Sequence, residues 1–142
     1  MMCGRFYNDE TVKTQLQSII DEDESNIEHK DYYPSDTLSV IIGYNKKKVL
    51  KSFTWGYSVF QGKVINARCE TLFEKKMFQE DIYLHRCIIP AKGFYEWDHL
   101  KHKISFENDD VIYMAGLYHE NEVVIITTQA NEVIKPIHSR MP

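Results

Sequence analysis

The sequence predicts one α+β domain, built on a bent, mainly antiparallel β-sheet or partly closed barrel with a few short helices. Three observations predict this fold. The 142 residues suit a single domain, and no repeat, linker or low-complexity segment divides them. Hydrophobic residues make up 43% of the chain, with only six Gly and four Pro, as in globular proteins. In the second half, short β-branched and aromatic runs alternate with polar turns, which is typical of antiparallel strands.

The first expected element is a helix that follows Asn8 or Asp9, either of which can cap its start. Its apolar face consists of Val12, Leu16, Ile19 and Ile20. We expect the helix to end near Asp21, because the carboxylates clustered there are unfavourable at the negative end of a helix dipole. A loop that contains Pro34 follows it.

A hairpin is expected next, because two β-rich segments, 37–44 and 49–55, flank the polar stretch 45–48. Residues 71–78 carry apolar side chains at helical spacing, which predicts a short helix. The strands expected in the second half are 87–90, 93–97, 104–106, 111–117 and 123–127, with a polar turn at 108–110.

The overall charge does not indicate a nucleic-acid partner, since the net charge is −4 and the pI is near 5.8. Much of the acid lies in the run 21–24, so the remaining chain can still hold a local basic cleft. The longest apolar runs, such as 123–126, are far shorter than the roughly 20 residues of a membrane span. The start lacks the apolar core of a signal peptide. We therefore expect a soluble, cytoplasmic protein without a membrane partner.

The three cysteines, Cys3, Cys69 and Cys87, are odd in number and include no Cys-x-x-Cys pair. This pattern is typical neither of a disulfide scaffold nor of a structural zinc site. The sequence also lacks a Cys/His cluster at zinc spacing and a glycine-rich phosphate loop. We expect reduced thiols, no cofactor and no metal.

The opening Cys3-Gly4-Arg5-Phe6 can carry chemistry if the cysteine becomes the amino-terminal residue. Such a cysteine holds a thiol and an α-amine on adjacent carbons. The amine, with a pKa of about 8, can form a Schiff base with an aldehyde. The thiol can then close on the imine carbon to give a thiazolidine. Taken alone, the residue would be read as a small buried cysteine.

Three further residues could assist such chemistry. Glu96 lies in the aromatic run 93–97, where burial can raise its pKa toward neutrality and make it a general acid or base. His138 can carry protons near neutral pH. In Asn66-Ala67-Arg68-Cys69-Glu70-Thr71, the Asn66 amide can hold a terminal amine and Arg68 can pair with phosphate. Taken alone, these patterns also fit ordinary surface residues and a helix cap.

In this order the four segments resemble the SRAP (SOS response-associated peptidase) family, which includes abasic-site sensors. Its members show MCGRF at the start, N-A-R-x-E-T, a G-F-Y-E-W strand and a terminal H-x-R-M-P. The match runs from Cys3 to Pro142. Each motif is short, but their shared order makes the resemblance specific.

The resemblance implies that the chain bonds covalently to abasic sites in single-stranded DNA once the initiator Met is removed. Cys3 would be the nucleophile, and Asn66 would orient its α-amine. Glu96 and His138 would transfer protons during ring opening and imine formation. The implied DNA-binding residues are Arg5, Arg68 and Arg86 for phosphates, Trp55 and Phe94 for base stacking, and Pro34 for shaping the site. Binding would be selective for structure rather than for sequence, and the bound protein would be associated with the nucleoid.

Two features depart from the family pattern. Met1 and Met2 both precede Cys3, and a thiazolidine cannot form while Met1 persists. Either the natural chain starts at Met2, or Met1 is not part of the natural protein, or self-cleavage releases both. The chain stops at Pro142, where the family usually continues with a further strand and a Trp-containing helical segment. We therefore expect a single SRAP domain over residues 1–142 that lacks this segment.

Two other functions remain open. The first is a thiol-dependent peptidase in which Cys3 attacks, His138 is the base, and Asn66 or Glu96 orients it. The second is a non-catalytic module for single-stranded DNA in which the arginines and aromatics matter and Cys3 does not. Substitution of Cys3 separates these functions from covalent capture.

Overall fold

The computed structural model describes residues 3–142, so the expected removal of Met1 and Met2 lies outside the described residues. The elements up to residue 68 are β1 (Phe6–Asn8), α1 (Glu10–Gln17), β2 (Glu22–Asp23), β3 (Lys30–Tyr32), β4 (Thr37–Tyr44), β5 (Lys47–Trp55), β6 (Tyr57–Val59), β7 (Gly62–Val64) and β8 (Asn66–Arg68). The later elements are the 3-10 helix η1 (Lys76–Phe78), α2 (Asp81–Leu84), β9 (Arg86–Trp97), β10 (Lys103–His119), β11 (Glu122–Gln129) and β12 (Arg140–Met141).

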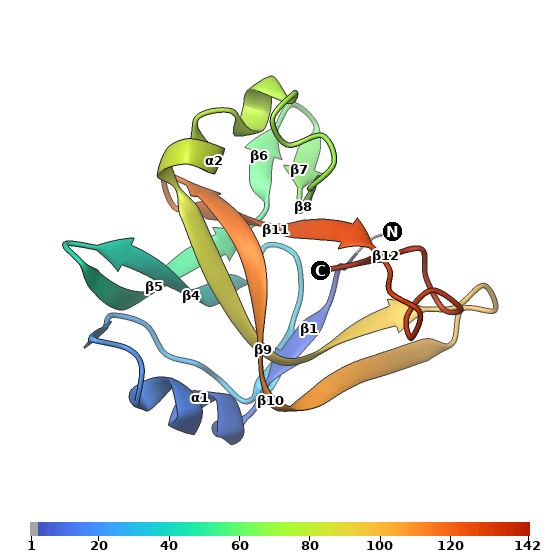
Figure 1. The fold of residues 1–142 in the computed structure, drawn as a ribbon, viewed down its shortest axis with the longest axis horizontal. Coiled ribbons are helices and arrows are strands. Elements are labelled where there is room, and N and C mark those ends of the chain that lie inside the picture. Colours follow the sequence, from blue (N-terminus) through green and yellow to red (C-terminus); the bar gives the residue numbers. More distant parts are fainter. Residues whose placement is uncertain (1–2) are drawn as a thin grey trace.

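A single large sheet curls on itself and forms most of the molecule (Figure 1). Its main path runs β10-β11-β5-β4-β9-β1-β3, and β9 also pairs with β10. Because β9 pairs with both β4 and β10, the strands β9, β10, β11, β5 and β4 close into a ring. Most pairs are antiparallel, whereas β11 is parallel to β5 and β8, and β2 is parallel to β5. The predicted α+β fold with a bent, partly closed sheet is confirmed.

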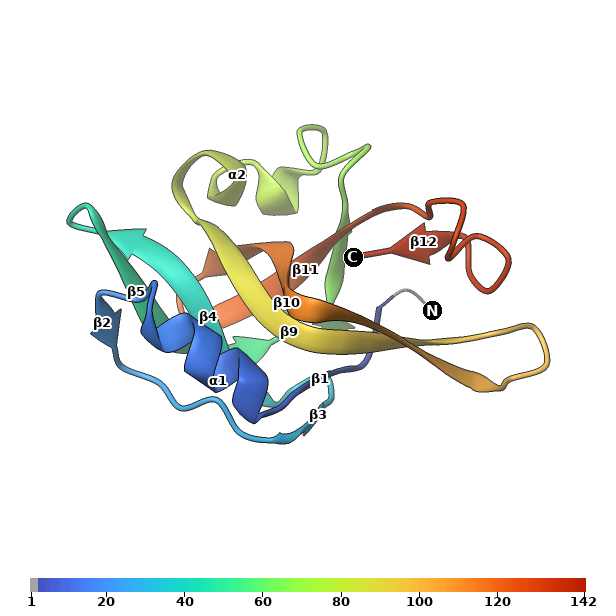
Figure 2. The same ribbon diagram turned by 60° about the horizontal axis from the view of Figure 1, so that its bottom comes forward.

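The two longest strands, β9 and β10, each join two segments that the sequence predicted as separate strands (Figure 2). The predicted turn at 108–110 is wrong, because these residues lie within β10. There the pairing with β9 shifts register between Glu107 and Ile112. The Lys92 ammonium donates to the Asn108 carbonyl oxygen at 2.8 Å, so the extra residues bulge while the strands stay together. A bulge of this kind bends the strand that carries it.

Helix α1 forms as predicted, with Asp9 as its cap. The Asp9 carboxylate accepts from the backbone N–H groups of Thr11 and Val12, at 3.0 and 3.3 Å. Val12 and Leu16 are buried in a side cluster between the helix and the sheet. The helix ends at Gln17, and Ile19 beyond it is 38% exposed.

The predicted hairpin is formed by β4 and β5. Tyr44 pairs with Lys47, so the turn itself is only Asn45 and Lys46. Both turn residues have positive φ angles, 50° and 62°, which is the geometry of a tight two-residue hairpin turn. Residues 47 and 48, predicted at the tip, belong to β5.

The predicted helix over 71–78 is wrong. The segment consists of turns followed by η1, and the nearest α-helix is α2. Of its apolar residues, Leu72 and Phe78 are buried in a side cluster, whereas Phe73 and Met77 are exposed. Leu72 reaches the cluster from a turn and Phe78 from η1, so the burial of both requires no regular helix.

The main core fills the inside of the ring and extends to the start of the chain. Its fully buried members include Cys3, Phe6, Trp55, Ile89 and Ile125. Between residues 3 and 142, no helix is both long and apolar enough to cross a membrane.

The glycine of the 93–97 motif has a steric role in this core. A Cβ on Gly93 would lie 2.6 Å from the Tyr7 ring and 2.6 Å from the Phe106 carbonyl oxygen. Because Gly93 has no Cβ atom, β1 and β10 can pair closely with β9 on its two sides. This pairing keeps Cys3, which precedes β1, beside the end of β9.

Candidate active site

Cys3 is placed by the pairing of β1 with β9. Phe6 lies opposite Phe94, and the Tyr95 N–H donates to the Arg5 carbonyl oxygen at 3.0 Å. This pairing carries the residues before β1 along the last part of β9, where Glu96 lies. Cys3 is completely buried there.

Asn66, the first residue of β8, holds the backbone of Cys3. Its side-chain amide donates to the Cys3 carbonyl oxygen at 3.1 Å and reaches the Ile125 carbonyl oxygen at 3.5 Å. The parallel pairing of β8 with β11 sets Asn66 opposite Ile125. A single amide therefore ties the start of the chain to the barrel wall.

Glu96 is a buried carboxyl group in β9, with 1% of the residue exposed. Burial raises its pKa from 4.5 to about 7, because the charged form loses its water. Its Oε1 atom has no hydrogen-bond partner within residues 3–142. At neutral pH this group can either donate or accept a proton.

The Glu96 carboxyl group affects the pKa of the Cys3 thiol. Burial, and then the negative charge of Glu96, raise the pKa of the thiol to about 12. The thiol is therefore protonated at neutral pH and needs a proton acceptor before it can attack. Glu96 is the nearby charged group that can serve as one.

His138 completes the group, with its Nε2 atom 3.9 Å from the Glu96 Oε2 atom. The Arg140 N–H lies 3.1 Å from the His138 Nδ1 atom. The same Nδ1 atom lies 3.2 Å from the Arg140 carbonyl oxygen, so the backbone of Arg140 fixes the orientation of the ring in either tautomer. The four residues predicted as catalytic, Cys3, Asn66, Glu96 and His138, thus lie together.

Arg140 fixes the segment that carries His138, a role that sequence analysis missed. Its guanidinium donates to both Glu70 carboxylate oxygens, at 2.8 and 2.9 Å, and to the Thr127 carbonyl oxygen at 3.0 Å. The hydrogen bonds from Arg140 lower the pKa of Glu70 to about 2. The sequence offers one indication of this pair, since Glu70 and Arg140 are oppositely charged and each lies in one of the four motif segments.

Arg5 lies beside the site, between two aromatic rings. The carbon at the centre of its guanidinium is 4.1 Å from the Tyr33 ring centre and 5.0 Å from the Trp97 ring centre. Its buried Nε atom has no hydrogen-bond partner among the described residues. Pro34 follows Tyr33 directly, so the loop predicted to shape the site supports this arginine.

The predicted stacking of bases on Trp55 and Phe94 is not compatible with their burial. Trp55 is fully buried, and its indole N–H donates to the Ile65 carbonyl oxygen at 3.1 Å. Phe94 is 6% exposed and stacks on Phe106 with ring centres 5.3 Å apart. Both rings belong to the core, whereas Tyr33 is 44% exposed beside Arg5.

The remaining two predicted arginines lie in different places. Arg68 is exposed and lines two grooves, one with Lys135 and the other with Asn66, Lys75 and Lys76. This arrangement gives the molecule a local basic strip next to Asn66. Arg86 begins β9, at the opposite end of that strand from Glu96, and its Nε–H donates to the Ile82 carbonyl oxygen.

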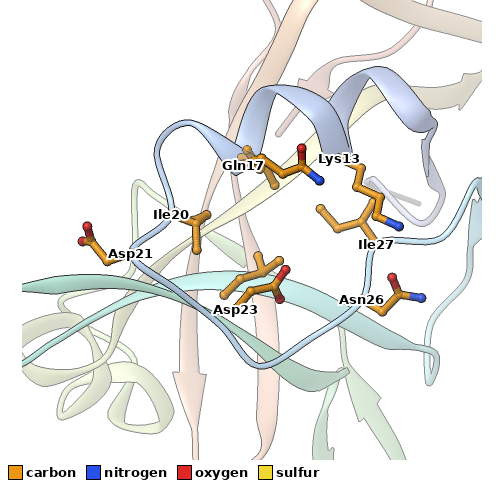
Figure 3. Close-up of a pocket in the computed structure, with 9 residues that line it drawn as sticks. Lys13, Gln17, Ile20, Asp21, Asp23, Asn26 and Ile27 are labelled. Atoms are coloured by element: carbon orange, nitrogen blue, oxygen red, sulfur yellow. The ribbon is translucent and has the colours of Figure 1, made fainter.

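A separate pocket of about 170 Å³ lies between α1 and the segment after it (Figure 3). The labelled residues are Lys13, Gln17, Ile20, Asp21, Asp23, Asn26 and Ile27. None of the predicted site residues lines it. Its carboxylates, Asp21 and Asp23, do not favour a phosphate chain.

The curled sheet and this site define a protein with a buried thiol near its amino terminus, next to a carboxyl group of near-neutral pKa and an imidazole. The chain belongs to the SOS response associated peptidase (SRAP) family, whose model matches residues 2–142. The predicted family is therefore confirmed.

Relatives in bacteria and yeast are 29–34% identical to the chain in sequence. The abasic site processing protein YoqW of Bacillus subtilis is 34% identical over 173 aligned positions, which cover 99% of this chain and 75% of that protein. The abasic site processing protein YoaM of the same species is 33% identical, with 99% and 74% covered. The abasic site processing protein YMR114C of Saccharomyces cerevisiae is 29% identical over 67% of this chain and 31% of its own length.

Two crystal structures share the fold. A protein from Bordetella bronchiseptica superposes with a TM-score of 0.79 at 17% identity, with 98% of this chain and 82% of that chain covered. A protein from Bacteroides thetaiotaomicron gives a TM-score of 0.76 at 23% identity, with 99% and 75% covered.

Proposed function

We propose that this chain is an abasic-site processing protein that captures the open-chain aldehyde of an abasic site in single-stranded DNA through Cys3. The relatives that align with nearly all of the chain are named abasic site processing proteins. The observation that carries the proposal is the hydrogen bond from Asn66 to Cys3, beside a carboxyl group with a pKa of about 7.

The proposed reaction needs no co-reactant besides the aldehyde. The α-amine of Cys3 attacks the aldehyde carbon, and loss of one water molecule leaves an imine. The thiol sulfur then bonds to the imine carbon, and the thiol proton passes to the nitrogen, which closes a thiazolidine. Glu96 is suited to protonate the departing oxygen and then to accept the thiol proton, since its pKa lies near neutrality.

The α-amine of Cys3 must first be released from the residues that precede it. We propose that Cys3 attacks the carbonyl carbon of Met2, so that the acyl group moves to sulfur and the amine becomes free. Water then hydrolyses the thioester. The same residues, with Glu96 and His138 as proton carriers, would serve this cleavage and the later capture of the aldehyde.

The DNA is expected to follow the basic strip of Arg68, Lys75, Lys76 and Lys135. All four are exposed, and Arg68 is common to both grooves. Arg5, stacked between Tyr33 and Trp97, would bind a phosphate beside the reacting sugar. Such contacts hold the backbone and do not read base sequence.

A denaturing gel tests the proposal with protein whose amino terminus is shown by mass to be Cys3. Incubation with single-stranded DNA that carries one abasic site should give a shifted band, and Cys3→Ser should give none while still binding the DNA. Peptide cleavage without a shifted band would instead support the peptidase. DNA binding that is unchanged in Cys3→Ser, with no shifted band from either protein, would support a binding module.

A further inference from the structure

A cluster of two imidazoles and one carboxylate lies on α2, away from the Cys3 site. Asp81 is the first residue of α2, His85 follows its last turn, and His119 is the last residue of β10. The Asp81 Oδ1 atom lies 2.7 Å from the His85 Nδ1 atom and 3.1 Å from the His119 Nδ1 atom. One possible ligand atom from each of the three residues lies within 4.8 Å of the other two.

The carboxylate of this cluster is held in place by a further residue. Asp81 is 1% exposed, and its Oδ2 atom accepts a hydrogen bond of 2.9 Å from the Tyr57 hydroxyl. One oxygen is thus bound to Tyr57, while the other points at both imidazoles. Outer partners of this kind orient the ligands in metal sites.

The imidazoles are also positioned by the fold, and the cluster is open to solvent. The Tyr118 N–H donates to the His85 carbonyl oxygen at 2.9 Å, which ties the end of α2 to β10. The His85 ring packs on the Tyr118 ring with centres 4.9 Å apart. The His119 side chain is 48% exposed, so an ion and a water molecule can enter from that side.

The donor set and its spacing fit a zinc-like ion. Two imidazoles and one carboxylate, with water in the fourth position, form a common tetrahedral arrangement for Zn²⁺. Bond lengths of 2.0–2.2 Å place neighbouring ligand atoms about 3.3–3.6 Å apart. The observed separations of 2.7 and 3.1 Å are close to that range, so small side-chain shifts would admit the ion.

We propose that Asp81, His85 and His119 form a binding site for a divalent transition-metal ion such as Zn²⁺. The ion would tie α2 to β10 and to β6 through Tyr57, and would thereby stabilise the segment between β8 and β9. Imidazole ligands favour zinc-like ions over Mg²⁺, which prefers oxygen ligands. Sequence spacing does not indicate this group, because one of its members is a carboxylate and His119 is distant in the chain.

The experiment is a thermal melt of chelator-treated protein with ZnCl₂ or MgCl₂. A ligand that binds only the folded state stabilises it, and at a hundredfold excess over its Kd this raises the Tm of a domain of this size by on the order of 10 °C. Zn²⁺ should raise the Tm of the wild type and Mg²⁺ should not. His119→Ala should abolish the rise, and His119→Gln serves as a second variant that keeps more of the side-chain volume.

His102→Ala is the matched control. His102 pairs with Asp98 at 3.1 Å in the same i, i+4 arrangement as His85 with Asp81, but it belongs to no three-residue cluster among the described residues. Its Zn²⁺ response should equal that of the wild type. Equal responses in wild type and both His119 variants, or an equal response to Mg²⁺, would overturn the proposal. Co²⁺ can be added in place of Zn²⁺, and an absorption spectrum that shows thiolate ligands to the bound Co²⁺ would also overturn the proposal.

Discussion

Glu96 is a carboxyl group whose burial opposes its ionisation. Its pKa rises from 4.5 to about 7, so the folded protein keeps a proton that the unfolded chain has already lost between these values. Stability therefore falls as the pH rises through this window, and the full cost is present above it. Glu96 thus lowers the stability of the folded protein above neutral pH, and the same carboxyl group lies close enough to Cys3 to affect the pKa of its thiol.

The first prediction concerns the stability of Glu96→Gln relative to the wild type. The variant has no carboxyl group to ionise at this position. The free energy of unfolding of the variant minus that of the wild type should therefore increase by on the order of 1–3 kcal/mol between about pH 4 and about pH 8. Urea unfolding at both pH values measures this difference. A constant difference between the two proteins would contradict the raised pKa.

The second prediction concerns Asn66→Ala. Loss of its hydrogen bond to the Cys3 carbonyl oxygen should slow crosslinking about fivefold, because one such bond contributes about 1 kcal/mol to holding the amine in place. Affinity for intact single-stranded DNA should stay unchanged. Asn26→Ala, an exposed asparagine in the pocket of Figure 3, is the matched control. Equal rates for both variants would count against the role of Asn66.

Sequence motifs predicted which four polar side chains gather at the candidate site, but they mispredicted the exposure of two aromatic side chains. Cys3, Asn66, Glu96 and His138 are brought together as predicted. Trp55 and Phe94 were predicted to face DNA because aromatic residues suit both core and base stacking. Whether an aromatic side chain lies in the core or faces DNA depends on how the strands pack, and in this fold both side chains are buried.

At the scale of elements, the contact between Glu70 and Arg140 joins β8 and its following turn to β12. Arg140 is buried, and its two bonds to Glu70 hold the segment whose backbone positions His138. The pKa of Glu70 is lowered to about 2, so the stabilisation is present above its ordinary pKa of 4.5. It is lost as the pH falls from there toward 2.

The third prediction follows from this pair. Acidification from about pH 5 to about pH 2.5 should lower the stability of the wild type more than that of Glu70→Gln, in which the contact no longer titrates. Chemical denaturation at a series of pH values measures the difference. Glu74→Gln removes an exposed carboxylate of the same turn and should behave as the wild type. A Glu70→Gln curve parallel to the wild type would refute this linkage.

Local patterns predicted the elements that depend on local interactions. The capped helix α1 and the two-residue hairpin are both set by residues close in sequence. The turn predicted at 108–110 became a bulge because β9 holds β10 on both sides of it. The helix predicted at 71–78 does not form, because Leu72 is buried from a turn and Phe78 from η1 rather than both from one helical face. Both errors arise from contacts between distant residues.

At the scale of the whole molecule, charge is divided between two regions. The net charge is −4, and an acidic run lies at residues 21–24, next to the pocket of Figure 3. The strip of Arg68, Lys75, Lys76 and Lys135 lies instead along the grooves beside Asn66. Such separation lets an acidic protein attract a phosphate backbone at one place.

The fourth prediction concerns the salt dependence of non-covalent DNA binding, measured with Cys3→Ser. Each strip residue that contacts a phosphate should contribute about 0.7 to the slope of log affinity against log salt. Arg68→Ala and Lys135→Ala should therefore reduce the slope. Lys46→Asn, in the hairpin turn, should leave it unchanged. Equal slopes in all three variants would mean that the DNA does not follow the strip.

The covalent bond proposed between Cys3 and the abasic aldehyde can be tested by the intact mass of the crosslinked product. The mass of the product should equal the mass of the protein plus that of the DNA minus one water molecule. Borohydride should add no hydrogen to it, because a closed thiazolidine has no imine to reduce, and peptide mapping should place the DNA on Cys3. A product that borohydride reduces, or one attached to a lysine, would contradict the account.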